Sequence, residues 1–122
     1  MKRNEKYSLQ VCDNSYYELH IGDNIELEIE DVIDIVKTQQ VISGKKMPVL
    51  VLCDEFAMTG LDVMRYLSKN ENFPYSSAGA YVFHSLSQKI LANFYLKIHH
   101  PQRPTKFFTN KNDAIDWLKQ YL

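Results

Sequence analysis

The run Pro48-Val49-Leu50-Val51-Leu52-Cys53 is apolar almost throughout and does not alternate with polar residues. A strand with one face in water alternates apolar and polar side chains, so an unbroken apolar run indicates a strand that is covered on both faces. Strands of this kind occupy the middle of parallel sheets, whose crossover connections place helices on both sides. This run therefore predicts an α/β fold with residues 48–53 near the centre of the sheet.

The N-terminal part of the chain has the pattern of a β-hairpin. A turn-forming segment, Asp13-Asn14-Ser15, separates two stretches in which apolar and polar residues alternate. The apolar positions on these two stretches are Tyr7, Leu9, Val11, Tyr17, Leu19 and Ile21.

Helical and extended segments alternate through the rest of the chain. Helices are expected from about residue 29 to a glycine cap at Gly44, from Gly60 to about Lys69, from a Ser85 cap to Ile98, and from Asn110 onward. Short strands are expected at 78–83 and 105–108. The stripes expected to face the core include Ile29, Val32, Ile33 and Val36, then Leu61, Met64 and Leu67, then Leu86, Ile90, Leu91, Phe94 and Ile98.

The order of elements, ββαβαβαβα, predicts an N-terminal β-hairpin joined to a mostly parallel sheet with about four helices. A chain of 122 residues is the size of one domain, so we expect a single domain over residues 1–122. Apolar residues make up 45% of the chain and charged residues 24%, as in ordinary globular proteins.

Several classes of function are disfavoured by composition. The 14 Lys and Arg residues nearly balance the 15 Asp and Glu residues, which argues against a dedicated nucleic-acid-binding protein. The apolar runs are too short to cross a bilayer, and the N-terminus lacks the apolar core of a signal peptide. Cys12 and Cys53 fit neither a disulfide framework nor a zinc site. We therefore expect a cytoplasmic protein without a metal or cofactor.

The element order resembles the STAS domain, the SpoIIAA-like fold of the sporulation anti-anti-sigma factors, which is also related to lipid-carrier domains of the CRAL-TRIO type. The C-terminal third resembles a group of small uncharacterised bacterial STAS-like proteins more closely. The matching residues are 93–98, Pro101, 104–106, Phe108-Thr109 and Ala114-Ile115-Asp116-Trp117-Leu118. This resemblance implies a SpoIIAA-like fold, whereas for the narrower group it implies no particular activity.

The same resemblance implies a candidate regulatory switch in the stretch CDEFAMTGL. In the anti-anti-sigma factors, a serine at the start of the second helix is phosphorylated by a partner kinase. Here Asp54 matches the aspartate that ends the central strand, and Thr59-Gly60-Leu61 matches the hydroxyl-Gly-Leu pattern. Met58 stands where that pattern has an aspartate, and the spacing from Asp54 is shorter. The alternative interpretation, which we favour, is that Thr59 caps the helix, with Asp62 three residues later.

Two further groups of residues are candidate sites. Lys97, His99, His100, Arg103 and Lys106 form the only local cationic cluster, which is either an anion- or partner-binding surface or a solvated connecting loop. Asp54 and Glu55 follow the central strand, where a cation site is conceivable, although solvated acids are the simpler interpretation.

No catalytic motif is present, so we expect a protein that is not an enzyme. The first functional hypothesis is a STAS-like regulatory or protein-interaction module with a protein partner. The second is a carrier of a small lipid or apolar ligand, suggested by the fold kinship and by eight tyrosines and six phenylalanines. The third is an enzyme that uses Asp54 or a histidine. A homo-oligomer is compatible with the sequence.

Overall fold

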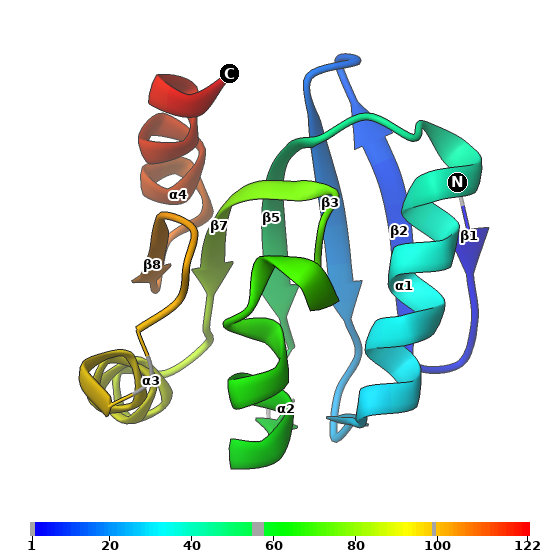
Figure 1. The fold of residues 1–122 in the computed structure, drawn as a ribbon. Helices are drawn as coiled ribbons and strands as arrows, with labels where there is room; N and C mark the ends of the chain where they lie inside the picture. Colours follow the sequence, from blue (N-terminus) through cyan, green and yellow to red (C-terminus); the bar gives the residue numbers. More distant parts are fainter. Residues whose placement is uncertain (1, 55–57, 99) are drawn as a thin grey trace.

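The structure is a computed structural model that describes residues 2–54, 58–98 and 100–122. Within these residues, six strands form one sheet in the order β1-β2-β3-β5-β7-β8 (Figure 1). The strands are β1 (Lys2–Arg3), β2 (Tyr7–Cys12), β3 (Tyr16–Ile21), β5 (Met47–Cys53), β7 (Ser76–Val82) and β8 (Thr105–Phe108). The helices are α1 (Ile29–Ile42), α2 (Leu61–Leu67), α3 (Leu86–Ile98) and α4 (Lys111–Leu118). Two short strands, β4 (Glu26–Leu27) and β6 (Met58–Thr59), pair separately, and single 3₁₀ turns span Asn70–Asn72 and Lys119–Tyr121.

The strand β5 lies in the interior of the sheet, as the apolar run predicted. It pairs in parallel with β3 on one side and with β7 on the other. Leu50 and Val51 point to opposite faces of the sheet, yet both are buried. The predicted α/β fold, with an N-terminal hairpin joined to a mostly parallel sheet, is confirmed.

The N-terminal hairpin is also confirmed. β2 and β3 pair antiparallel, with Tyr7 opposite Ile21 and Cys12 opposite Tyr16. The connecting turn holds Asp13 and Asn14 at positive φ (52° and 53°), a conformation that Asn and Asp adopt more easily than most residues. Because β1 adds a short antiparallel edge next to β2, the sheet extends one strand beyond the predicted hairpin.

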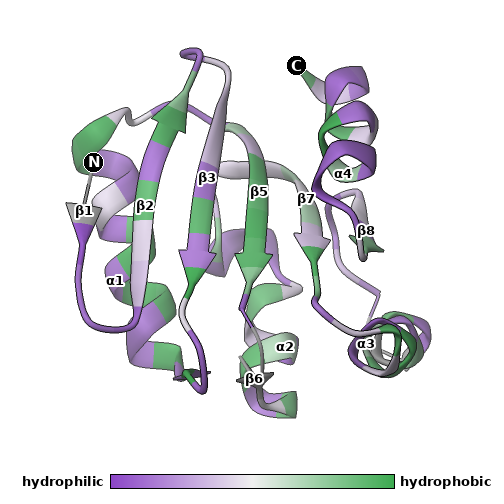
Figure 2. Ribbon diagram, turned by 180° about the vertical axis from the view of Figure 1, so that it is seen from behind, coloured by the Kyte–Doolittle hydropathy of each residue, from purple (hydrophilic) through white to green (hydrophobic). Residues whose placement is uncertain are grey.

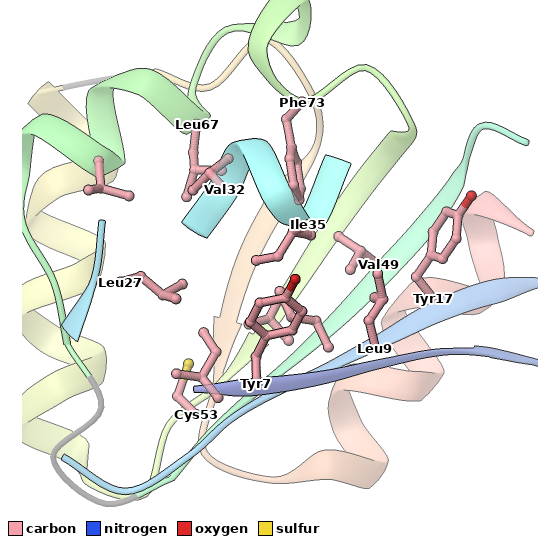
Figure 3. Close-up of a cluster of buried hydrophobic side chains, with 14 of the residues drawn as sticks. Tyr7, Leu9, Tyr17, Leu27, Val32, Ile35, Val49, Cys53, Leu67 and Phe73 are labelled. Atoms are coloured by element: carbon pink, nitrogen blue, oxygen red, sulfur yellow. The ribbon is translucent and has the colours of Figure 1, made fainter. Parts of the chain in front are cut away.

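Helices cover the two faces of the sheet unequally. α1 and α2 lie over one face, which we call the α1 face, and α4 lies over the opposite face, which we call the α4 face (Figures 1 and 2). The larger core lies on the α1 face and includes Leu9, Tyr17, Ile35, Val49 and Phe73 (Figure 3). The smaller core on the α4 face contains Leu50, Ala80, Phe108, Ala114 and Leu118.

Most helix ends carry the polar residues expected there. Ser85 precedes α3: its Oγ accepts a hydrogen bond from the Gln88 amide at 3.1 Å, as a cap does. The Asn110 side chain likewise accepts hydrogen bonds from the amides of Asn112 and Asp113 at the start of α4. Gly44 follows α1 with φ of 69°, the left-handed conformation that ends many helices.

Three predicted apolar stripes are corrected by the structure. On α1 the buried position is Ile35 rather than Ile33, which is partly exposed. On α2 the residue Leu61 is exposed, whereas Val63 and Leu67 are buried. On α3 the residues Leu86, Ile90, Leu91 and Phe94 are exposed. The spacing identified these helices correctly, but spacing does not tell which side of a helix the sheet covers.

Candidate functional site

An apolar cavity of about 110 Å³ lies between the α1 face of the sheet and the helices. Residues from both the sheet and the helices line it, among them Leu19, Val51, Phe107, Ile35, Met64 and Ala92. Leu27, Leu67 and Cys53 lie around the same space (Figure 3). The cavity is therefore built by elements far apart in the sequence and could not be read from any single motif.

The ionisable groups in the cavity lining are neutral at physiological pH. Burial raises the pKa of the Cys53 thiol to about 12 and that of the Tyr81 phenol to about 12. A thiol with so high a pKa is a poor nucleophile, because the reactive species is the thiolate. The cavity thus offers a neutral surface suited to an uncharged apolar group.

A polar cluster lies where three neighbouring parallel strands end. Asp54, directly after β5, places its Oδ1 2.6 Å from Nε2 of His20 and 3.9 Å from Nε2 of His84. His20 lies near the end of β3, and His84 follows β7. All three side chains are partly exposed. The Asp54 carboxylate forms a hydrogen bond with the His20 ring and can orient it, whereas the distance to His84 is too long for a hydrogen bond.

This polar cluster and the cavity do not form one site. His20 lies between Leu19 and Ile21, which both line the cavity. Because side chains alternate across a strand, His20 points to the α4 face, away from the cavity. A ligand inside the cavity is therefore separated from the His20 imidazole by the sheet.

The predicted role of Thr59 as a helix cap is wrong. Thr59 belongs to β6, where it pairs with Leu27 of β4. The N-cap of α2 is Gly60, and α2 begins at Leu61. Glycine is among the residues preferred at an N-cap, although it has no side chain that can accept a hydrogen bond from the first turn. Of the pair Asp54 and Glu55, Glu55 lies outside the described residues.

The predicted cationic cluster is not a single surface. The guanidinium of Arg103 is buried and donates to the Leu67 carbonyl at 2.5 Å and to the Lys69 carbonyl at 3.2 Å. Assigning Arg103 to an exposed anion surface was therefore wrong. Lys106 lies over the ring of Phe108 on the α4 face. Lys97 and His100 are exposed, and His99 lies outside the described residues.

No sequence motif connects His20 or His84 with Asp54, from which they are 34 and 30 positions away in the chain. A signal was available, because carboxyl ends of neighbouring parallel strands meet at one edge of a sheet. Strand order was the missing information: once β3, β5 and β7 are known to be neighbours, the three polar side chains must lie close together.

Two common features are absent from the part of the chain that the structure describes. No group of three or more His, Cys, Asp or Glu side chains within residues 2–54, 58–98 and 100–122 is arranged to hold a metal ion. In those same residues, every helix is too short or too polar to span a bilayer.

Comparison with known proteins places the chain in a family. The family model described as "Domain of unknown function (DUF7793)" matches residues 18–122. The chain belongs to the DUF7793 family. In this member of DUF7793, the match includes β3 from Glu18 onward, all later strands and all four helices. No curated protein matches the chain significantly.

One solved structure supports the fold assignment. An uncharacterised protein of the DUF3478 family with a SpoIIAA-like fold, from Shewanella loihica PV-4, matches with a TM-score of 0.55 and 15% identity. That match covers 97% of this DUF7793 chain and 98% of the Shewanella chain. A protein of unknown function from Arthrobacter sp. FB24 matches with 26% identity and a TM-score of 0.29, covering 92% and 98% of the two chains. The Shewanella structure confirms the likeness to uncharacterised SpoIIAA-like proteins.

Proposed function

We propose that this protein is a non-catalytic binding domain whose cavity on the α1 face takes up a small apolar ligand or the apolar end of a lipid. The cavity itself is the observation that carries this proposal: about 110 Å³ of space lined almost wholly by apolar side chains. Apolar cavities of about 150 Å³ stay dry and bind benzene-sized molecules, because water needs several polar partners to enter. The lining of the present cavity is similarly apolar and therefore favours an apolar guest over water.

The arrangement of the polar groups around the cavity supports a non-catalytic role. The lining thiol of Cys53 and phenol of Tyr81 are held neutral by burial, which raises both pKa values. The imidazole of His20 points to the opposite face of the sheet. A guest in the cavity thus meets neither an activated nucleophile nor a general base from these groups.

A cavity-filling variant tests the proposal. Ala92 is buried on α3 and lines the cavity, so Ala92→Phe is expected to fill the space and to abolish binding of a neutral aromatic probe such as benzene. For the parent chain, a probe at 100 times its Kd is expected to add about 2.7 kcal/mol to the free energy of unfolding. Calorimetric titration and thermal unfolding measure both effects.

The matched control is Val41→Phe, which adds the same ring at an exposed position of α1, away from the cavity. This control is expected to bind the probe as the parent does. Equal probe binding by Ala92→Phe and the parent, or no saturable binding by the parent, would contradict the proposal. Native mass spectrometry of freshly purified protein would identify a natural ligand carried through purification.

The second candidate function is a regulatory module that binds a protein partner. This hypothesis also follows from the sequence. This candidate is favoured by Leu61, an exposed apolar residue at the start of α2. Leu61 lies two positions after Thr59, the residue that matches the phosphorylated serine of the anti-anti-sigma factors. Because Gly60 takes the cap position, the threonine is not needed to cap α2.

For this candidate, Thr59→Asp places a phosphate-like negative charge at the interface. We expect the amount of partner captured to change, in either direction, by about tenfold or more. The free energy of unfolding, measured by thermal denaturation, should change by less than about 0.5 kcal/mol. The loss of a helix cap would lower it by about 1 kcal/mol. Pull-down from a lysate with parent and variant proteins measures the first effect, and Thr59→Ser is the matched control. A lower stability with identical partner capture would argue against the regulatory role.

A further inference from the structure

The outer side of α3 carries an exposed apolar stripe. Leu86, Ile90 and Phe94 are spaced four residues apart and are 64%, 61% and 57% exposed. Residues with this spacing lie along one side of a helix. In Figure 1, α3 lies at the lower left margin of the fold, below β8 and on the opposite side from α1. Large apolar side chains gathered on a surface mark a site of contact with a partner or a lipid phase.

The inner side of α3 forms part of the cavity wall. Ala92 is buried and lines the cavity, together with Gln88 and Leu91. Leu91 is also 52% exposed. A side chain that borders both the cavity and the solvent marks where the cavity reaches the surface. Leu91 therefore connects the apolar lining of the cavity with the apolar stripe on the outer side of α3.

The charge of this region is one-sided. Residues 72–112 contain five Lys or Arg residues and no Asp or Glu, although the chain has 15 acidic residues. Three of these cations have local partners. Arg103 binds backbone carbonyls, and Lys111 pairs with Glu18 at 3.1 Å. Lys106 lies over the ring of Phe108. Lys89 and Lys97 lie on α3 itself. A helix that carries an apolar stripe and two lysines, and no acid of its own, complements an anionic apolar surface.

From this combination we infer that α3 docks on the surface of an anionic lipid bilayer, with Leu86, Ile90 and Phe94 inserted among the lipids. The bilayer is then the source of the apolar group that enters the cavity past Leu91. This second step rests on the proposed function, whereas docking does not. Lys97 follows the stripe in the last turn of α3, where its long side chain reaches the headgroups.

Size and charge favour a bilayer over a protein partner. A stable protein interface needs about 800 Å² from each partner, contributed by about 20–30 residues. One stripe on a helix of 13 residues supplies much less, whereas an interfacial helix needs only its own apolar side. In a symmetric pair of chains joined through α3, each Lys97 would meet a helix that carries no acid.

Flotation with vesicles tests the inference. The full chain is mixed with vesicles of phosphatidylcholine alone or with phosphatidylglycerol added. We expect flotation with the anionic vesicles and at least about tenfold weaker binding for the double variant Leu86→Ser with Ile90→Ser, which removes two inserted side chains. Lys97→Glu is expected to weaken binding to anionic vesicles by a similar factor, because the charge changes sign.

Two matched controls lie on α1. Val41→Ser removes an exposed apolar side chain and Lys37→Glu reverses an exposed charge, and both variants should float as the parent does. All four variants alter exposed positions, so each is expected to fold, which thermal unfolding checks. Ala92→Phe should still dock, so loss of probe binding in that variant separates the cavity from the docking surface.

Several outcomes would overturn the inference. One is no flotation at lipid concentrations up to about 1 mM, where even a single acyl anchor binds. Equal binding to vesicles with and without phosphatidylglycerol is another. A third is self-association, or capture of an acidic protein, that depends on Leu86 and Ile90 while vesicles stay unbound. Docking without any probe binding in the cavity would uphold the docking surface and contradict the proposed function instead.

Discussion

Replacing Tyr17 with alanine is expected to lower the free energy of unfolding by about 4 kcal/mol. Tyr17 is the largest of the fully buried side chains and lies in the core of the α1 face. Its hydroxyl donates a hydrogen bond to the carbonyl of Lys45 at 2.6 Å. The alanine variant therefore leaves a cavity and also leaves that carbonyl without its partner. Urea denaturation followed by circular dichroism measures the loss.

Tyr17→Phe is the matched control, because it keeps the ring and removes only the hydroxyl. Its expected cost is about 1 kcal/mol, the net value of one hydrogen bond. The difference between the two variants isolates the contribution of ring burial. A cost below about 1 kcal/mol for Tyr17→Ala would show that the core of the α1 face is not packed as described.

Replacing Arg103 with alanine is expected to cost about 3 kcal/mol, a large effect for a cation. The guanidinium joins the segment before β8 to the end of α2, through the carbonyls of Leu67 and Lys69. It also lies over the ring of Phe73, with 5.3 Å between Cζ and the ring centroid. Burial lowers the pKa of Arg103, yet arginine remains charged at every physiological pH. Without it, two carbonyls lose charged donors.

Two comparisons separate the causes of that loss. Arg103→Met keeps most of the apolar stem, so the stability difference between it and Arg103→Ala reports packing alone. Lys106→Ala removes a nearby exposed cation and should change stability by less than about 0.5 kcal/mol. Urea denaturation of the three variants provides the values. Unchanged stability in Arg103→Ala with weakened binding of an anion would restore the surface role that the sequence suggested.

The contacts of Arg103 that stabilise the fold also involve a residue of the cavity wall. Leu67 lines the cavity, and its carbonyl is held by Arg103. We therefore regard Arg103 as a positioning residue for the cavity wall. This role explains why an arginine within a group of cations is buried although its neighbours Lys97 and Lys106 are exposed.

Much of the fold was predictable because local sequence carries it. The unbroken apolar run identified β5 as a doubly covered strand, and Asp13-Asn14-Ser15 identified the hairpin turn. Ser85 and Asn110 marked helix starts, since their side chains satisfy amides only one turn away. Each of these signals depends on neighbours within a few residues.

The candidate sites depend on contacts that no local pattern records. The cavity joins β3, β5, β7 and β8 with three helices, and the polar cluster joins His20, Asp54 and His84 across three strands. Arg103 was assigned to the surface because cations are usually exposed, whereas its partners are carbonyls more than 30 positions earlier in the chain.

The sequence by itself determined the four helices, the N-terminal hairpin and the inner strands, and that β5 is buried, whereas β1, β4 and β6 were not expected. Only the tertiary structure decided which side of each helix is covered. The stripe on α3 has the same spacing as a core-facing stripe, but α1 and α2 already lie over the α1 face, and α3 contributes Ala92 to the core instead. Periodicity fixes the angle between side chains on one helix, whereas burial depends on which surfaces remain uncovered after the other elements have packed.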